Sequence, residues 1–338
     1  MTMEWSLRDI ENIPRNGYKV FSTFSCGGGS SMGYKLAGYD VIGNCEIDAK
    51  IAEMYKANHH PKYSYLMDIR KFVNLDDLPE ELYSLDILDG SPPCSVFSIA
   101  GEREEGWGKT KHFREGQAAQ TLDDLFFEYI KLLVKLRAKV FIAENVKGLV
   151  LGKAKGYVNE ILSQLEKGEY KTQIFCLNSA KMGVPQRRER VFFIGHRKEL
   201  DYPKLKLNFD ESTVAFGTIR SAKGKPVSPQ TKELLKQKIS TDTCIADINE
   251  RIFQKKSGFN NPIVWDNVVA PTITAGGSLY RAYDDSLFSD ADIINCQTFP
   301  YNYNFNGQDV QYVCGMSVPP LMMKLIAAEV AKQWLDCT

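Results

Sequence analysis

The stretch KVFSTFSCGGG, at residues 19–29, joins a short β-rich run to three consecutive glycines. Residues 19–24 have the apolar composition of a buried strand. Glycines directly after a strand permit a tight turn with free backbone N–H groups, and a helix is predicted at residues 32–37. A strand, a glycine turn and a helix in this order predict the first unit of an α/β fold.

The same alternation continues along the first two-thirds of the chain. Further strands are predicted at residues 41–46, 85–89, 140–143, 174–177 and 191–195, and further helices at 49–57, 122–137 and 157–166. Strand–helix alternation predicts a mostly parallel, Rossmann-like sheet with helices on both faces. Ligands bind at the carboxyl ends of the strands in such sheets, so residues that follow strands are candidate site residues.

The second part of the chain has a different character. From about residue 196 to 298 it is rich in Lys, Asn, Asp and Ser, with only short apolar pieces, and a last helix is predicted after Pro319 and Pro320. The chain of 338 residues is long enough for one large and one smaller domain. We therefore expect a main domain at 1–195, a smaller domain at 196–298 and a segment at 299–338 that returns to the main domain.

Composition restricts the class of protein. The chain is 43% hydrophobic and 25% charged, which is typical of a folded protein. No run approaches the roughly 18 apolar residues of a membrane span, and the first residues do not resemble a signal peptide, so we expect a cytoplasmic protein without a membrane partner. The eight cysteines are scattered without a CxxC pair, which predicts reduced thiols and no metal site.

The charges cancel overall, with 42 basic and 42 acidic residues, but they are segregated. Residues 66–89 are mostly acidic, whereas residues 181–198 and 219–240 are mostly basic. The two basic blocks either bind a polyanion or form ordinary solvated surface, and composition alone favours the second interpretation.

Acidic residues at strand ends indicate a nucleoside cofactor. The glycine turn alone is equally consistent with a plain tight turn, and its spacing does not give the GxGxxG pattern for a dinucleotide. Glu46 closes the second strand, where a carboxylate can accept both ribose hydroxyls, and Asp68 follows the next apolar run. A ribose-binding acid without a pyrophosphate motif indicates an adenosine cofactor without phosphates, such as S-adenosylmethionine.

Three further groups stand at strand ends. Cys94 follows Ser91-Pro92-Pro93 after a strand, and the two prolines restrict the backbone before a candidate nucleophile. Glu144 ends the strand at 140–143. Arg188 and Arg190 lead into the strand at 191–195 on one face of an extended chain. Each group also has a structural interpretation without a catalytic role. Cys94 would be an inert buried thiol, Glu144 a capping carboxylate, and the arginines part of a surface ion pair.

Taken in order, the blocks FSCGGG, PPC, ENV, QRRER and GMSVPP resemble the DNA (cytosine-5) methyltransferase family from about residue 18 to 330. The resemblance implies catalytic roles for Cys94, Glu144, Arg188 and Arg190. It also implies contacts to S-adenosylmethionine from Phe24, Ser25, Cys26, Gly27, Gly28, Gly29, Glu46, Ile47, Asp68, Ile69, Ser91, Pro93, Leu125, Ser317 and Val318.

The resemblance also implies a reaction and its partners. Cys94 would add to C6 of a cytosine flipped out of duplex DNA, so that C5 can take the methyl group, with Glu144 at N3 and Arg190 at O2. Residues 196–298 would be the target-recognition domain. A restriction endonuclease acting on the same site is a further partner that the resemblance allows, and one active site per chain implies a monomer when active.

The sequence departs from the family pattern at four places. Cys26 stands where glycine is frequent, Ser95 where glutamine is usual, and Met316 where asparagine is common. The arginine expected near residues 287–290 is missing. A tRNA-modifying branch of the same fold shares the Pro-Pro-Cys block, but its Cys-Phe-Thr element is absent from this sequence. A silent DNA-binding relative would not need Cys94, Glu144 and Arg190, and a nicotinamide or flavin enzyme would need the missing glycine pattern.

Overall fold

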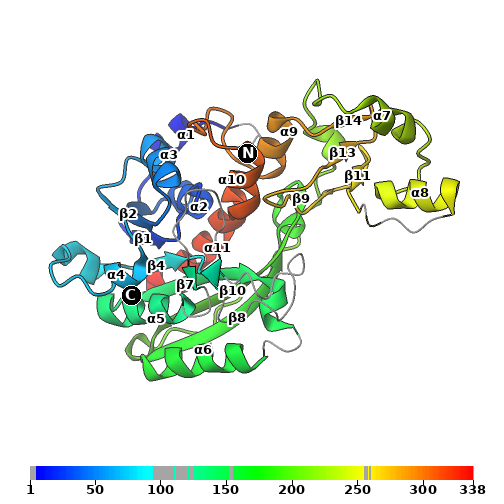
Figure 1. Ribbon diagram of the computed structural model, residues 1–338. Helices are drawn as coiled ribbons and strands as arrows, with labels where there is room; N and C mark the ends of the chain where they lie inside the picture. The colour runs from blue at the N-terminus through cyan, green and yellow to red at the C-terminus, as the bar shows by residue number, and fades with distance from the viewer. Residues whose placement is uncertain are drawn as a thin grey trace.

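The computed structural model describes residues 5–93, 110–111, 120–121, 125–151, 155–254, 258 and 260–337. Its centre is a seven-stranded sheet in the order β3-β2-β1-β4-β7-β10-β8 (Figure 1). The strands are β1 Lys19–Thr23, β2 Asp40–Glu46, β3 Tyr63–Leu66, β4 Ile87–Gly90, β7 Val140–Val146, β8 Tyr170–Asn178 and β10 Glu189–Arg197. Only β10 runs antiparallel to its neighbours, which confirms the predicted mostly parallel α/β sheet.

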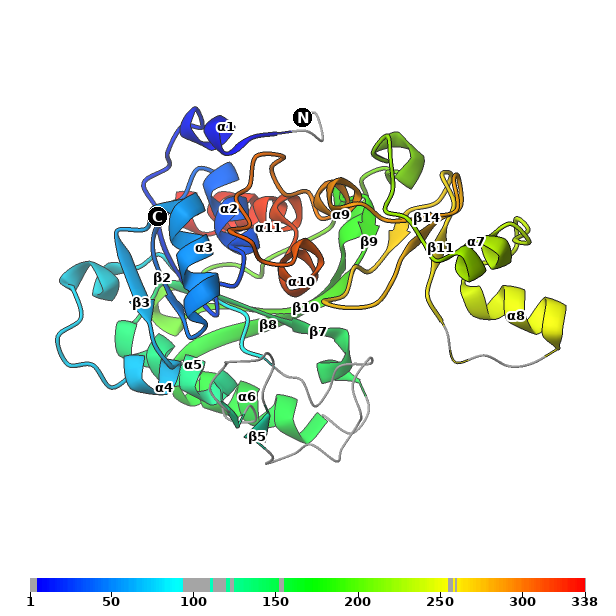
Figure 2. The same ribbon diagram turned by 45° about the horizontal axis from the view of Figure 1, so that its top comes forward.

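Helices cover both faces of this sheet, as predicted (Figure 2). On one face lie α4 Ile69–Phe72, α5 Leu125–Leu136 and α6 Lys155–Lys167. Their apolar side chains, such as Phe72, Tyr129 and Ile161, form one buried core with the sheet. On the other face, α2 Gly29–Leu36 packs against α11 Pro320–Gln333 around a second core that includes Tyr34 and Trp334.

The six predicted strands all correspond to strands of the central sheet, and one strand of that sheet was missed. The helix predicted at 49–57 is α3 Ala49–His59. The helix predicted at 122–137 contains α5, and the helix predicted at 157–166 corresponds to α6. The missed strand is β3, which pairs only with β2 at the sheet edge. Its side chains are half-buried or exposed, so it lacks the apolar run that identifies a central strand.

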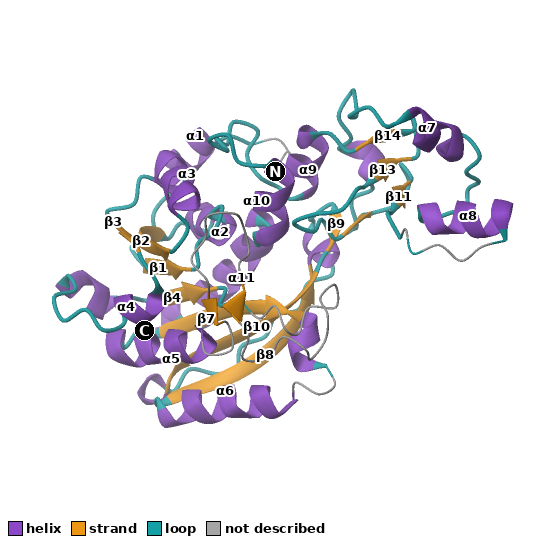
Figure 3. Ribbon diagram, viewed as in Figure 1, coloured by secondary structure: helices purple, strands orange, loops and turns teal. Residues whose placement is uncertain are grey.

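The chain beyond β10 contains short elements joined by long loops (Figure 3). These elements are α7 Pro229–Leu235, α8 Ile245–Phe253, the small sheet β11 Ile263–Val264, β13 Tyr280–Arg281 and β14 Ser286–Leu287, and then α9 Asp290–Cys296 and α10 Val310–Met316. The pair β9 Gln186–Arg187 and β12 Ala270–Pro271 connects this region to the start of β10. Tyr202, Leu205 and Leu207 still belong to the core that contains Trp334.

The remaining elements are short. They are α1 Leu7–Glu11, β5 Thr110–Lys111 with β6 Gln120–Thr121, and the 3-10 helices Glu80–Ser84, Lys147–Val150, Ser179–Met182, Lys198–Leu200, Phe216–Thr218 and Leu335–Cys337.

One helical stretch, Val310–Cys337, is long and apolar enough to cross a membrane by length and composition. However, 67% of its most apolar window is buried inside the protein. The stretch contains α11, whose residues Met322, Ile326 and Val330 lie in the core against the central sheet. Its apolar character is therefore accounted for by packing within the fold.

Candidate active site

The glycine turn leads from β1 into α2, and its glycines are required by packing. A Cβ on Gly27 would lie 2.5 Å from Val313 Cγ1, and side chains on Gly28 or Gly29 would overlap His59 or the Val318 carbonyl oxygen. Gly28 also has φ +68°, a left-handed conformation that favours glycine. We expected the glycines to let a ligand approach, but here they let α3, α10 and the start of α11 approach.

A pocket opens at the carboxyl ends of β1, β2 and β4, where the sheet predicts a ligand. Nine of the predicted cofactor residues line it: Phe24, Cys26, Glu46, Ile47, Asp68, Ile69, Ser91, Pro93 and Leu125. The other predicted cofactor residues do not line this pocket: Ser25, Gly27, Gly28, Gly29, Ser317 and Val318.

Sequence reasoning missed several lining residues. They are Thr23, Cys45, Asp48, Ile51, Met67 and Tyr312, and Met316 was noted only as a departure. Four of them, Thr23, Cys45, Asp48 and Met67, lie within two residues of predicted contacts, so strand-end position was a usable signal. Tyr312 and Met316 reach the pocket from α10, about 290 residues from the glycine turn, and nothing local in the sequence indicates this.

Glu46 connects the end of β2 to the glycine turn. Its Oε2 accepts from the Cys26 backbone N–H at 3.0 Å, and its Oε1 accepts from those of Ile47 and Asp48 at 2.9 and 3.1 Å. Burial raises the pKa of Glu46, and these three hydrogen bonds oppose the increase. A carboxylate offers about four lone-pair positions, so one position is left for a ligand hydroxyl. Accepting two hydroxyls would require one backbone amide to be released.

Asp68 and several apolar side chains complete the pocket. Asp68 caps α4 by accepting from the Arg70 backbone N–H at 2.8 Å, and it also pairs with the Arg70 guanidinium at 3.0 Å. Phe24, Ile47, Ile69, Leu125 and Pro93 provide apolar walls. Three carboxylates, those of Glu46, Asp48 and Asp68, between apolar walls suit a group with a flat apolar face and polar edges, such as an adenosine.

The end of β4 lies beside this pocket and is tied to the end of β7. Ser91 and Pro93 line the pocket, and the Asn145 side-chain amide donates to the Pro92 carbonyl oxygen at 3.0 Å. Cys94, the predicted nucleophile, lies outside the described residues. The structure therefore describes the residues that precede Cys94. One of them, Pro92, accepts a hydrogen bond from Asn145 of the ENV block.

Glu144 and Arg190 form an ion pair across β7 and β10. The distance from Arg190 Nε to Glu144 Oε1 is 3.0 Å, and the two side chains are only 14% and 11% exposed. Burial lowers the pKa of Arg190, and the carboxylate of Glu144 opposes this decrease. Arg190 Nη1 donates to the Glu189 carbonyl, while Nη2 has no partner among the residues that the structure describes. The pair therefore places a guanidinium and a carboxylate side by side at one end of β7 and β10.

Arg188 has a different position from Arg190. Its side chain is 2% exposed, and it donates to the Ile273 carbonyl through Nη1 at 3.0 Å and to the Gly315 carbonyl through Nη2 at 2.9 Å. Burial lowers the pKa of Arg188 to about 9, and the charge of Arg190 adds to the decrease. Both guanidinium ends are therefore used by the protein's own backbone.

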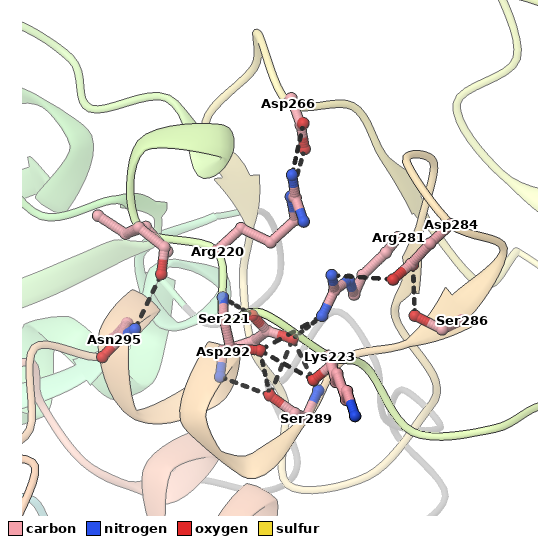
Figure 4. A network of polar contacts seen from close by, with 11 residues as sticks. Arg220, Ser221, Lys223, Asp266, Arg281, Asp284, Ser286, Ser289, Asp292 and Asn295 are labelled. Atoms are coloured by element: carbon pink, nitrogen blue, oxygen red, sulfur yellow. Dashed lines mark hydrogen bonds and ion pairs between the residues drawn. The ribbon is translucent and has the colours of Figure 1, made fainter.

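The basic blocks are largely neutralised by nearby carboxylates. The ion pairs are Lys181–Asp210, Arg197–Glu199, Lys198–Glu166, Arg220–Asp266, Lys225–Asp290, Lys236–Glu233 and Lys238–Asp285. Figure 4 shows Arg220 pointing to Asp266, while the Lys223 side chain extends without a carboxylate. Arg187, Lys223 and Lys232 are exposed and have no acidic partner within the described part of the chain.

Residues that could hold a metal are not grouped in this structure. In the described ranges, no three His, Cys, Asp or Glu side chains lie together in a ligand arrangement.

This sheet, with a pocket at its carboxyl edge and a buried acid–arginine pair, defines a Rossmann-like α/β fold with a candidate active site. Residues 18–332 match the family described as C-5 cytosine-specific DNA methylase, and the chain belongs to this family. It is accordingly an enzyme, a DNA methyltransferase of the cytosine C5 class.

Relatives support the same assignment over most of the chain. The chain is 31% identical over 346 residues to the Type II methyltransferase M.Sau96I of Staphylococcus aureus, covering 94% of this chain and 77% of that protein. It is 32% identical over 350 residues to the Type II methyltransferase M.FnuDI of Fusobacterium nucleatum, covering 94% and 95%. A crystal structure of a putative prophage-encoded DNA modification methyltransferase from E. coli shares the fold, with TM-score 0.67, 18% identity and coverage of 94% and 99%.

Proposed function

We propose that this enzyme transfers a methyl group from S-adenosylmethionine to C5 of a cytosine in a specific duplex DNA sequence. The main supporting observation is the connection between two strand ends. Glu144 pairs with Arg190, and the neighbouring Asn145 is bonded to the Pro92 carbonyl, two residues before Cys94. An acid, a cation and the segment of a candidate nucleophile therefore meet beside one pocket.

Cys94 acts as the nucleophile in this proposal. Its thiolate adds to C6 of the cytosine, and the electron pair of the C5–C6 bond becomes available at C5. After C5 has gained its methyl group, loss of the C5 proton to a base expels the cysteine and restores the ring. The target base leaves the duplex for this reaction, at a cost of a few kcal/mol for unstacking.

Glu144 and Arg190 stabilise the charge that develops on the pyrimidine ring. Glu144 protonates or hydrogen-bonds N3, and the guanidinium of Arg190 donates to O2. Because the two side chains already hold each other at 3.0 Å, little reorganisation is needed when the base arrives. Arg188, with both ends bonded to backbone carbonyls, acts through position and not by contact with the base.

The pocket residues fit S-adenosylmethionine. Glu46 takes a ribose hydroxyl with its remaining lone pair, Asp68 lies at the polar edge, and Phe24, Ile47 and Leu125 lie against the apolar faces. When bound, this cofactor supplies the electrophilic methyl group. Apart from Cys94, the chain's own residues bind, orient and exclude water from the reacting groups.

Each of the three parts of the chain has its own role in this proposal. Residues 1–195 carry the cofactor pocket and the catalytic residues, residues 196–298 read the DNA sequence, and residues 299–338 complete the main domain. Arg187, Lys223 and Lys232 contact phosphates, because they are the exposed cations without described acidic partners in the two basic blocks. The enzyme acts as a cytoplasmic monomer, and a restriction endonuclease with the same site is a partner consistent with its Type II relatives.

Transfer of label from S-adenosylmethionine tests this function. Mixed-sequence duplex DNA and unmodified tRNA are offered in parallel, Cys94→Ala is the control, and the product base is identified. Label at C5 of cytosine in DNA, abolished by Cys94→Ala, is the expected result. Label only in tRNA would assign the tRNA-modifying reaction, and label in neither substrate, with cofactor still bound, would indicate a silent relative.

A further inference from the structure

Three polar side chains are buried between the recognition region and the cofactor pocket. Gln186 and Gln297 are 0% exposed and Arg188 is 2% exposed. A buried amide or guanidinium is costly unless its polar atoms are bonded, and apolar side chains of similar volume would fill the same space at less cost. The hydrogen bonds of these three side chains must therefore compensate for their burial, and the segments that these bonds connect indicate their role.

The first connection is to Ile273, which lies just beyond β12 in the recognition region. The Ile273 backbone N–H donates to Gln186 Oε1 at 2.9 Å, and its carbonyl accepts from Arg188 Nη1 at 3.0 Å. Both polar groups of this residue are thus fixed by side chains from the QRRER block. The position of Ile273 is determined relative to the start of β10, where Arg190 stands.

The second connection is between the two glutamines. Gln186 Nε2 donates to Gln297 Oε1 at 2.6 Å, and Gln297 Nε2 donates to the Ser317 carbonyl at 2.7 Å. Arg188 reaches the Gly315 carbonyl. The carbonyls on both sides of Met316 are therefore held, and Met316 itself lines the cofactor pocket.

The third connection is between this pocket wall and the glycine turn. A Cβ on Gly27 would lie 3.0 Å from Ser317 Oγ, and Gly29 packs directly under the Val318 carbonyl. Cys26, which directly precedes Gly27 in the turn, donates its backbone N–H to the Glu46 carboxylate. Because these contacts leave no free space, a displacement of Ser317 must displace the turn and the pocket edge.

We propose that Gln186, Arg188 and Gln297 form a buried hydrogen-bond relay, which holds the carbonyls of Gly315 and Ser317 and so aligns Met316, in the wall of the cofactor pocket, with the recognition segment at Ile273. The three are positioning residues that act through Ile273, Gly315 and Ser317. The relay rests on the proposed function for the identity of the cofactor, whereas its connections rest on the structure alone. Two glutamines that bond in series act as a unit, so their contributions are coupled.

Methionine variants test the relay, since methionine keeps the volume of glutamine and removes its hydrogen bonds. The variants are Gln186→Met, Gln297→Met and the double variant, and the affinity for S-adenosylmethionine is measured calorimetrically without DNA. Gln173→Met is the matched control, because Gln173 bonds to the backbone N–H and carbonyl of Leu205, which does not line the pocket.

We expect Gln297→Met to weaken cofactor binding about tenfold. Gln186→Met should weaken it at least threefold, although the side-chain hydrogen bonds of Gln186 go to residues outside the lining of the pocket, and the double variant should be no worse than Gln297→Met. Gln173→Met should change thermal stability but leave the affinity within twofold. Equal affinities for all variants, or losses that multiply in the double variant, would overturn the relay.

A conservative variant and amide exchange supply independent measurements. In Gln297→Glu, a protonated carboxyl can donate to the Ser317 carbonyl and an ionised one cannot, so binding relative to wild type should recover at acidic pH. Gln186→Met should also speed hydrogen exchange across residues 313–318, with or without cofactor, and unchanged exchange there would contradict the proposal. If wild type methylates no DNA, the proposed function fails while these exchange measurements still decide the relay.

Discussion

The guanidinium of Arg281 and the carboxylate of Asp292 form an ion pair at 3.3 Å in which neither side chain is exposed to solvent. Asp292 also accepts from the backbone N–H groups of Ser221 and Ser289 (Figure 4), so three segments converge on one carboxylate. The arginine expected near residues 287–290 is absent from the sequence. Arg281 instead reaches the first turn of α9 from β13.

Breaking this pair should destabilise the segments that meet at Asp292. We predict that Asp292→Ala lowers the free energy of unfolding by about 3 kcal/mol, because the buried guanidinium of Arg281 then keeps only its second carboxylate, the partly exposed Asp284 at 3.0 Å. Replacing both residues, as in Arg281→Met with Asp292→Leu, should cost less than Asp292→Ala alone. Urea unfolding of the two variants measures this difference, and a larger loss in the double variant would contradict the argument.

Salt dependence should distinguish paired from unpaired lysines. Lys223 and Lys232 have no described acidic partner, whereas Lys225 pairs with Asp290 and Lys236 with Glu233. We predict that Lys223→Ala with Lys232→Ala reduces the slope of log affinity against log salt by about 1 to 2, since each phosphate contact contributes about 0.9. Lys225→Ala with Lys236→Ala is the control with equal change in charge and should leave the slope nearly unchanged. Equal slopes for both pairs would make the block ordinary surface.

Glu144→Gln should separate binding from turnover. The carboxyl group is needed mainly as charge develops on the base, so we predict that turnover falls about 100-fold or more while DNA affinity changes less than threefold. Single-turnover rates and equilibrium binding to the same duplex provide the comparison. Equal losses in both quantities would show that Glu144 serves binding and not the chemical step.

Asp89 should make stability depend on pH. Burial raises the pKa of Asp89 to about 7, although hydrogen bonds from Ser22 and Tyr34 oppose this. The unfolded carboxyl titrates near 3.9, so the folded state holds its proton at higher pH. The contribution is therefore complete below about pH 4 and is lost as pH rises to about 7, by roughly 4 kcal/mol at most.

Chemical unfolding between pH 4 and pH 8 checks this behaviour. Asp89→Asn cannot ionise, so its stability should fall less than that of wild type over this range. Parallel curves for the two proteins would show that Asp89 does not titrate in this window.

The parts of the fold with a local signal could be predicted from sequence. Residues 19–23 and 191–195 are strands because their apolar runs are buried on both faces, and Glu46 and Ser91 lie at or just after strand ends. Glu144 was expected directly after its strand, but β7 continues to Val146. β3 was missed because an edge strand needs no continuous apolar run.

The relay and the α10 wall have no such signal. Gln186 and Gln297 are 111 residues apart, and their contact depends on how separate segments pack. The glycines were predicted to contact the cofactor, and this stays a prediction. That a Cβ on them would meet protein atoms of Val313, His59 and Val318 is visible only in the three-dimensional arrangement.

The packing of Tyr202, Leu205 and Leu207 with Trp334 bears on how recognition regions can be exchanged between relatives. A chimaera joined at residue 196 would lose these three side chains and leave Trp334 Nε1 without its acceptor, the Pro203 carbonyl at 2.7 Å. A junction after Leu207 keeps the whole cluster with its native sheet. Grafts that begin there should yield folded enzymes with a new DNA preference, whereas earlier junctions should yield insoluble chains.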